Sequence, residues 1–424
     1  MKHVGVAILG LGVVGSGTYE ILRDHRQMYQ KTQNVDIVVE NVLELRKERA
    51  IALGISEDKI ASSIDTICNN PNVDIVVEVM GGITFAKDFV LKALEAGKTV
   101  VTSNKELYCK FSHELEACAK MHNAGLYYEA SCVGGVPVIR ALLDNLQGNK
   151  ILSLMGIVNG TTNYILTKMS ALGVSYQEVL KEAQSLGYAE ANPTADVEGY
   201  DATYKLSILS SLSFGTKVPY TKIYREGITN INQKDISYGK QLGYVLKLLA
   251  IGKNNPEGIE VRVHPTFISS SHPLASVNDS YNAVFITGDA VEDVMLYGRG
   301  AGKLPTGSAI VGDIIYAATH EKINYSPFNN TMDADPNTNF IKNFSSAYYL
   351  RLSVKDEKGV LAKVTSIFSK YNISCEKLIQ DINGDKTANL IIITHIAKEY
   401  DINQAVEEIN KDEACDVEAV IRVN

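Results

Sequence analysis

Two oppositely charged residues stand one helical turn apart in GYDATYKLSILSSLSFG, residues 199–215. A spacing of four places the side chains of Asp201 and Lys205 on one face of a helix. An exposed pair of this kind stabilises a helix by only ~0.3–0.5 kcal/mol. No further charge follows until Lys217, and apolar side chains predict burial: Leu206, Ile208, Leu209, Leu212 and Phe214. A charged turn that opens a buried helix indicates a cleft, in which an ammonium could stabilise negative charge and supply a proton.

A polar loop directly before this pair carries three acids: Glu190, Asp196 and Glu198. Acids gathered beside a lysine suit a substrate that has both an amine and a carboxylate, because each group then meets an opposite charge. The sequence therefore favours an amino acid as the substrate.

The first 135 residues alternate between apolar runs and segments with helical periodicity. This alternation predicts a parallel sheet with helices on both faces, in which ligands bind beyond the carboxyl ends of the strands. The predicted strands are 4–9, 35–45, 72–82, 98–105 and 126–130, with helices at 84–96 and 106–123 among the connections.

A glycine motif, GLGVVG, follows the first predicted strand and opens a helix. Its first glycine would permit a tight turn, its second would let the backbone approach a pyrophosphate, and its third would let the helix pack close to the strand. Glycines also occur in ordinary turns, but the order strand, turn and helix favours a dinucleotide site. The residues predicted to contact the cofactor there are Gly10, Leu11, Gly12, Val13, Val14 and Gly15.

Lys105 stands just past the fourth predicted strand, at a helix start. A cation is poorly placed there for the helix dipole. Lys105 could be a solvated lysine. At the cofactor edge of the sheet it could instead hold the substrate oxygen next to the nicotinamide or shuttle a proton, so it is a candidate for both cofactor binding and catalysis.

The end of the second strand bears on the choice between NAD and NADP. If that strand ends at Leu45, then Arg46 and Lys47 follow it, and cations there suit the 2′-phosphate of NADP. Glu40 and Glu44 are counter-evidence, because an acid would bind an unphosphorylated ribose. The two cations could also belong to an exposed charged loop. The balance favours NADP, with NAD as the alternative.

The pattern changes in the middle of the chain. ILSLMGIVNGTTNYIL, residues 151–166, predicts a strand that runs into a helix capped near Thr161 or Thr162. YGRGAGKLPTGSAIVGDIIYAA, residues 297–318, predicts a second glycine-rich turn followed by a helix. Gly302 in that turn is a candidate contact for the nicotinamide half of the cofactor.

Composition argues against several classes of protein. The net charge of −8 and the pI near 5.6 argue against a nucleic-acid-binding surface. The six cysteines lack a CxxC pair and the eight histidines lack an HxxxH or HExxH pattern, which disfavours a zinc site. No apolar run approaches the ~20 residues that span a membrane. We expect a soluble, cytoplasmic protein with free thiols.

Together these motifs closely resemble those of homoserine dehydrogenase. The resemblance covers roughly residues 1–320 and rests on GLGVVG, TSNK, NGTTNYIL, GYAEANPTADVEGYDATYK and GAGKLPTGSAIVGDI. It implies a reversible NAD(P)-linked reduction of L-aspartate 4-semialdehyde to L-homoserine, on the route to threonine and methionine. It also implies that Asp201 and Lys205 are the catalytic pair, with Lys105 as a second active-site lysine. The substrate-binding positions that it implies are Gly160, Thr161, Glu190 and Asp196.

The same resemblance implies a structural sodium ion. Oxygen ligands suit a hard cation of this kind, and a cysteine is unusual in this loop, although only its carbonyl would be needed. The implied ligands are Glu129 and the main-chain carbonyls of Cys132, Gly134 and Val136.

The C-terminal residues predict a βαββαβ unit of the ferredoxin-like type. Its first turn contains Asp356 and Gly359 in the order Asp-x-x-Gly-Val-Leu, which resembles an ACT domain, although Lys358 stands where relatives often have proline. The resemblance implies that an amino-acid effector, most simply threonine, binds near these residues at an interface between subunits of a homodimer or homotetramer. The unit could also be a packing module without a ligand.

The predicted fold class is α/β, with three domains. A Rossmann-type domain spans 1–135 and is completed by about 300–320, an α+β substrate and dimerisation domain spans 136–299, and a linker at 321–345 precedes the ACT domain at 346–424. Two other functions remain open. One is a non-catalytic sensor that binds nicotinamide and an amino acid, which would have little need of Lys105, Asp201 and Lys205 together. The other is an oxidoreductase for another small amino-acid aldehyde.

Overall fold

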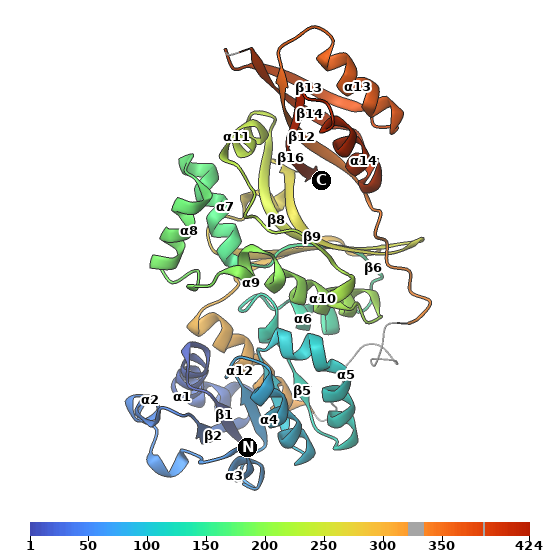
Figure 1. Ribbon diagram of the computed structural model, residues 1–424. Coiled ribbons are helices and arrows are strands. Elements are labelled where there is room, and N and C mark those ends of the chain that lie inside the picture. The colour runs from blue at the N-terminus through green and yellow to red at the C-terminus, as the bar shows by residue number, and fades with distance from the viewer. Residues whose placement is uncertain (321–334, 385) are drawn as a thin grey trace. The chain divides into compact units, whose positions relative to one another are not determined.

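The computed structural model describes residues 1–320, 335–384 and 386–424 (Figure 1). These residues form two compact units. The first comprises residues 1–160, 201–223, 281–320 and 335–338, and the second comprises residues 161–200, 224–280 and the described residues from 339 to 424. Most of the predicted linker, residues 321–334, lies outside the described residues.

A five-stranded parallel sheet forms the centre of the first unit, in the order β2-β1-β3-β4-β5. The order of the strands reverses between β1 and β3, and ligands bind parallel sheets beyond the carboxyl ends of the strands at such a point. The sheet confirms the predicted doubly wound fold. Its strands are β1 (Lys2–Leu9), β2 (Val35–Leu43), β3 (Ile75–Glu78), β4 (Thr99–Thr102) and β5 (Leu126–Tyr127).

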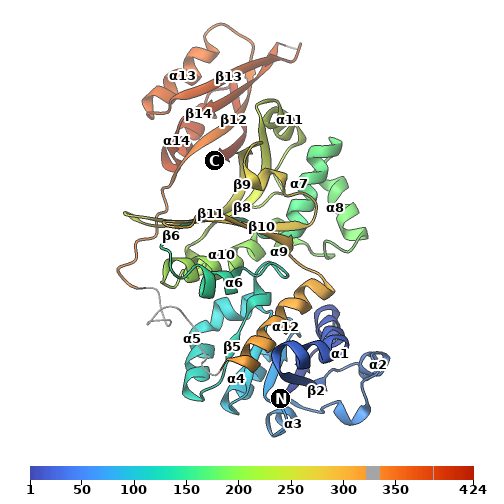
Figure 2. The same cartoon turned by 180° about the vertical axis from the view of Figure 1, so that it is seen from behind.

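Helices flank this sheet, and two of them come from distant parts of the chain. In both views α12, drawn in orange, lies beside α1, drawn in blue (Figure 1 and Figure 2). Glycine permits this approach, because a Cβ on Gly17 would lie 2.3 Å from the carbonyl oxygen of Lys303. The helices are α1 (Val13–Gln33), α2 (Lys47–Ala52), α3 (Ile64–Cys68), α4 (Thr84–Glu95), α5 (Lys105–Met121) and α12 (Lys303–Thr319).

The remainder of the first unit contains a short antiparallel sheet and the helix with the charged pair. The strands β6 (Ile151–Ile157), β10 (Tyr281–Gly288) and β11 (Glu292–Arg299) pair in the order β11-β10-β6, and α6 (Val138–Arg140) lies between β5 and β6 in the sequence. Helix α10 (Tyr200–Phe214) buries Leu206, Ile208 and Leu209, as predicted. Leu212 and Phe214 are only half-buried, because the last turn of the helix is less enclosed.

The second unit begins with helices and continues with a long hairpin. Strands β8 (Tyr244–Asn255) and β9 (Gly258–Ser269) pair antiparallel, and the two-residue strand β7 (Tyr224–Arg225) pairs parallel to β9. The helices are α7 (Gly160–Leu172), α8 (Tyr176–Ser185), α9 (Thr194–Val197) and α11 (Gln233–Gln241).

The C-terminal part of the second unit has the predicted βαββαβ order. Its antiparallel strands lie in the order β16-β12-β14-β13, and both helices pack on one face of them (Figure 2). Alternate residues of β12 face these helices, from Tyr348 to Val354. The elements are β12 (Ser345–Lys355), α13 (Val360–Lys370), β13 (Cys375–Ile382), β14 (Thr387–Thr394), β15 (Ala397–Lys398), α14 (Glu399–Ile409) and β16 (Cys415–Val423).

Several strands of the first sheet are shorter than the apolar pattern predicted. The preference for NADP assumed that the second strand ends at Leu45. This assumption is wrong, because β2 ends at Leu43 and the side chain of Leu45 is fully exposed. The run 126–130 contributes only Leu126 and Tyr127 to the sheet before the chain turns. An apolar pattern continues past a strand wherever the following turn is itself buried or happens to carry apolar residues.

Candidate active site

Three charged side chains of the first unit meet at the N-terminal ends of α5 and α10. The Nζ atom of Lys205 lies 2.7 Å from Oδ2 of Asp201, and the Nζ atom of Lys105 lies 3.2 Å from Oδ1 of the same carboxylate. Lys105 is the first residue of α5, after Asn104, whose side chain caps the helix by accepting from a backbone amide. Each oxygen of one carboxylate therefore faces a different ammonium.

The three groups differ in their exposure to solvent. The side chains of Asp201 and Lys205 are 9% and 11% exposed, whereas that of Lys105 is 37% exposed. Burial by itself raises the pKa of Asp201, but the two ammonium charges and a hydrogen bond from Asn159 outweigh it, so this pKa lies below its ordinary value of 3.8. Asp201 is therefore a carboxylate at neutral pH.

The end of β6 supplies two further contacts that the sequence analysis did not single out. Nδ2 of Asn159 donates to Oδ2 of Asp201 over 2.9 Å, and Nζ of Lys205 donates to the carbonyl of Val158 over 2.7 Å. Asn159 opens the NGTTNYIL motif, and a polar residue just past a strand end was the signal that could have identified it. These contacts orient the charged pair.

The glycine motif turns at the carboxyl end of β1. Gly10 has a φ of 95°, which favours glycine, and a Cβ on Gly15 would lie 1.9 Å from the carbonyl oxygen of Gly10. A Cβ on Gly12 would instead meet no heavy atom within 4 Å. Gly10 and Gly15 are therefore required by the fold of the loop, whereas Gly12 borders open space.

This difference predicts that alanine at Gly12 affects cofactor binding, whereas alanine at Gly15 affects stability. Gly12→Ala is expected to keep the melting temperature within a few degrees and to raise the KM for the cofactor about tenfold or more, because a methyl group would occupy the space for the pyrophosphate. Gly15→Ala is expected to lower the melting temperature, because backbone atoms must move. Thermal melting and steady-state kinetics check both variants. Normal cofactor affinity in Gly12→Ala would contradict the assignment.

An acid, rather than a cation, directly follows β2. The carboxylate of Glu44 accepts hydrogen bonds from the amides of Leu11, over 2.7 Å, and Arg46, over 2.9 Å, and its side chain is 8% exposed. Arg46 and Lys47 are exposed at the start of α2. Glu44 therefore ties the end of β2 to the glycine loop, a role that the sequence analysis did not foresee.

The loop proposed for sodium lies between β5 and α6. Its successive residues Val133 and Gly134 are both left-handed, and the loop is largely buried. The side chain of Glu129 accepts from the amides of Ile139 and Arg140. Within the described part of the chain, no group of three or more His, Cys, Asp or Glu side chains could hold a metal ion. A cation here would therefore need main-chain carbonyls among its ligands.

The glycine turn before α12 packs against this same loop. A Cβ on Gly134 would lie 2.4 Å from the carbonyl oxygen of Gly300, and the amide of Gly135 donates to the carbonyl of Arg299. Gly302, with a φ of 127°, is the N-cap of α12. The turn that contains Gly302 therefore packs against the loop that follows β5.

The remaining candidates for substrate binding occur around α7 to α9. Gly160 begins α7, so the helix starts before the predicted cap at Thr161 or Thr162, and Oγ1 of Thr161 donates to the carbonyl of Tyr188 over 2.6 Å. Glu190 is exposed two residues further on, and Asp196 lies half-buried in α9. Thr161 therefore holds the turn that precedes Glu190.

The proposed effector residues lie at the turn between β12 and α13. Gly359 is the N-cap of α13 with a φ of 91°, and the carboxylate of Asp356 accepts from Nε2 of Gln380 over 3.1 Å. Both residues stand where the motif predicted them.

None of the described helices combines the length and the apolar character that a membrane crossing requires.

Comparison with known families gives three matches. The family model described as "Homoserine dehydrogenase" matches residues 137–315, "Homoserine dehydrogenase, NAD binding domain" matches residues 10–129, and "ACT domain" matches residues 348–414. Together they match most of the residues in both units.

Curated relatives match over nearly the whole chain. The homoserine dehydrogenase of Bacillus subtilis is 39% identical over 97% of this chain and 95% of its own length, and that of Corynebacterium glutamicum is 41% identical over 95% and 92%. Among solved structures, a homoserine dehydrogenase from Thiobacillus denitrificans matches with a TM-score of 0.93 and 37% identity over 100% of this chain and 99% of its own. A hyperthermophilic archaeal homoserine dehydrogenase in complex with NADPH matches with a TM-score of 0.64 and 29% identity over 74% and 98%.

Proposed function

The chain belongs to the homoserine dehydrogenase family and is an oxidoreductase with a nicotinamide-binding domain, and from this premise we propose that it reduces L-aspartate 4-semialdehyde reversibly to L-homoserine for threonine and methionine synthesis. The observation that carries the proposal is the convergence of Lys105, Asp201 and Lys205. A sensor without catalysis would not need two lysines on one buried carboxylate.

The chemistry follows from these charges. A reduced nicotinamide, when bound, would supply a hydride to the aldehyde carbon, so that negative charge would develop on the carbonyl oxygen. Lys205, oriented by Asp201, is the first candidate to stabilise that oxygen and donate a proton to it, with Lys105 as the alternative donor. Asp201 forms an ion pair with each lysine and thereby orients both amines toward the same point. In the opposite direction the same amine accepts the hydroxyl proton of homoserine.

The substrate-binding roles follow the family motif. Glu190 and Asp196 are proposed to hold the amino end of the substrate, since carboxylates bind an ammonium, and Gly160 and Thr161 are proposed to line the same site. A sodium ion is proposed to be held by Glu129 and the main-chain carbonyls of Cys132, Gly134 and Val136, because oxygen ligands suit a hard cation.

A direct assay tests the proposal. Purified protein is mixed with homoserine and either NAD or NADP, and the absorbance of the reduced nicotinamide is followed. Turnover of homoserine but not of other small amino-acid alcohols is expected. Absence of turnover with both cofactors would reject the dehydrogenase, and preference for another amino-acid alcohol would favour an oxidoreductase for a different aldehyde.

We further propose that the C-terminal domain binds an amino-acid effector, most simply threonine, near Asp356 and Gly359 in a cytoplasmic homodimer or homotetramer. The ACT match and the left-handed cap at Gly359 support this. The same assay with millimolar threonine, together with light scattering, tests it. Unchanged activity and unchanged mass would reject threonine as the effector.

We propose NADP as the preferred cofactor, because the carboxylate of Glu44 is engaged by two backbone amides and Arg46 and Lys47 remain exposed next to it. Replacing both Arg46 and Lys47 by alanine is expected to raise the KM for NADP about tenfold and to leave the KM for NAD within twofold, because only the 2′-phosphate loses a charged partner. Arg23→Ala, which removes an exposed ion pair with Asp24, is the control. A larger loss with NAD would contradict this preference.

A further inference from the structure

Strands β7 and β16 lie along the same edge of β9. Strand β8 pairs with β9 along its whole length, so both other strands must occupy the opposite edge. Strand β7 pairs there at Arg262 and Val263, and β16 pairs at Thr266 and Phe267. The last residues of the C-terminal domain therefore lie next to the two-residue strand β7.

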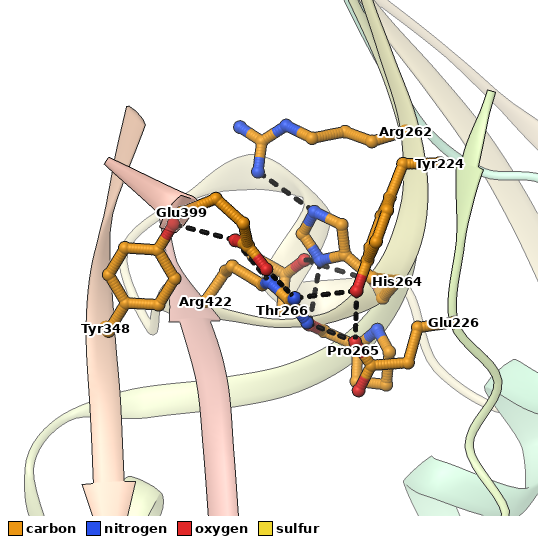
Figure 3. A network of polar contacts seen from close by, with 9 residues as sticks. All are labelled: Tyr224, Glu226, Arg262, His264, Pro265, Thr266, Tyr348, Glu399 and Arg422. Carbon is orange, nitrogen blue, oxygen red and sulfur yellow. Dashed lines mark hydrogen bonds and ion pairs between the residues drawn. The ribbon is translucent and has the colours of Figure 1, made fainter. Parts of the chain in front are cut away.

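Arg422 of β16 joins these neighbouring strands through its side chain (Figure 3). Its guanidinium forms ion pairs with Glu399 of α14 and with Glu226, which follows β7, and it donates to the hydroxyl of Tyr224 over 2.8 Å. The side chain of Arg422 is 5% exposed. Tyr348 of β12 donates to the carboxylate of Glu399 over 2.8 Å. One planar cation thus holds two acids that come from different parts of the unit.

His264 of β9 lies beside this junction, with its ring centre 6.2 Å from that of Tyr224. In the tautomer with the proton on Nδ1, His264 donates to the carbonyl of Pro265 over 2.9 Å. Its Nε2 then accepts a hydrogen bond from Arg262, also over 2.9 Å. Burial and the positive charges of Arg262 and Arg422 hold the pKa of His264 well below its ordinary value, so the ring is neutral. This histidine therefore does not change its charge near neutral pH.

The other residue of β7, Arg225, holds the acidic loop before α10. Its guanidinium donates to the carbonyl of Glu198 and lies 3.6 Å above the ring centre of Tyr200. The segment after β7 adds two contacts: the amide of Ile228 donates to the carbonyl of Val197, and Thr229 donates to the carboxylate of Glu198. The loop held in this way joins the end of α9, which contains Asp196, to the start of α10, which contains Asp201.

We propose that Arg225 is a positioning residue for the loop that holds the amino end of the substrate, and that Arg422 of the C-terminal domain sets the position of Arg225 through β7. The inference rests on the proposed function, which assigns Asp196 to the substrate. Consecutive residues in and directly after β7 contact different partners: Tyr224 and Glu226 contact Arg422, whereas Arg225 contacts the loop. A displacement of β16 relative to β9 is thereby transmitted to the substrate loop.

The test compares conservative variants at both ends of this connection. Arg225→Lys and Arg422→Lys keep the charge but lose the planar fork of donors. Each is expected to raise the KM for homoserine about fivefold while kcat and the KM for the cofactor change less than twofold. Lys370→Met, which removes an exposed ion pair with Glu408 in the C-terminal domain, is expected to change none of these. Thermal melting establishes that each variant is folded.

A double-mutant cycle shows whether the two arginines act through one connection. The double variant is expected to raise the KM for homoserine by much less than the product of the single effects. Independent effects that multiply would overturn the coupling. Folded single variants with a KM within twofold of the parent, or with equal changes in the KM for the cofactor, would overturn the positioning role.

A readout without turnover separates this inference from the proposed function. Hydrogen exchange of the peptide 190–200 is expected to be faster in Arg422→Lys than in the parent and unchanged in Lys370→Met. If the parent does not oxidise homoserine, the proposed function fails on that result. Unchanged exchange in Arg422→Lys overturns the connection whatever the substrate is.

Discussion

Lys205→Ala is expected to lower kcat by a factor on the order of 10² or more and to leave the KM for the nicotinamide cofactor nearly unchanged. The ammonium of Lys205 is buried, lies 2.7 Å from Asp201 and donates to the carbonyl of Val158. Its removal leaves no proton donor at that point. The cofactor is proposed to bind mainly through the glycine loop, which Lys205 does not contact.

The measurement compares kcat for homoserine oxidation in Lys205→Ala, Lys105→Ala and the exposed control Lys92→Ala. The control is expected to keep the parent rate, because Lys92 forms only a surface ion pair with Asp65. A larger decrease of kcat in Lys105→Ala than in Lys205→Ala would make Lys105 the proton donor. The greater exposure of the Lys105 side chain is an argument for that alternative. Near-normal turnover of Lys205→Ala would discard its assignment.

Asp201→Asn is expected to reduce both stability and turnover. The variant leaves the buried ammonium of Lys205 without a counter-charge, and breaking a buried pair in this way costs about 3–5 kcal/mol of unfolding free energy. Lys205→Ala should cost less, because Asp201 keeps Lys105 and Asn159 as partners. Turnover is expected to fall on the order of 10² because neither lysine is held in place.

The pH dependence of this stability difference has a definite sign. The pKa of Asp201 is lower in the folded protein than its ordinary value of 3.8. The carboxylate therefore stabilises the fold fully above that ordinary value, and the stabilisation is lost as the pH falls toward the folded pKa. Denaturant unfolding of the parent and Asp201→Asn should give a constant difference between about pH 5.5 and 7.5. A difference that grows on acidification would contradict the ion pair.

The C-terminal network shows why an ACT domain can be recognised in a sequence while its contacts with the rest of the unit cannot. The order βαββαβ and the turn at Asp356 follow from local patterns of apolar residues and glycine. The contacts of Arg422 with Glu226 and Tyr224 depend on the pairing of β16 with β9. No spacing in the sequence relates these positions, because they are brought together only by the edge of a strand.

Local patterns determined much of this protein. The spacing of Asp201 and Lys205, the glycine motif after β1 and the alternation of strands with helices depend on residues a few positions apart, so the sequence alone predicted them. The resemblance placed Lys105 in the same site as Asp201, but only the tertiary structure showed which carboxylate oxygen it faces. Tertiary structure alone decided that Glu44 holds the amide of Leu11 and that β2 stops at Leu43. Those outcomes depend on which distant segments pack together, and packing is decided by the whole buried core rather than by any one stretch of residues.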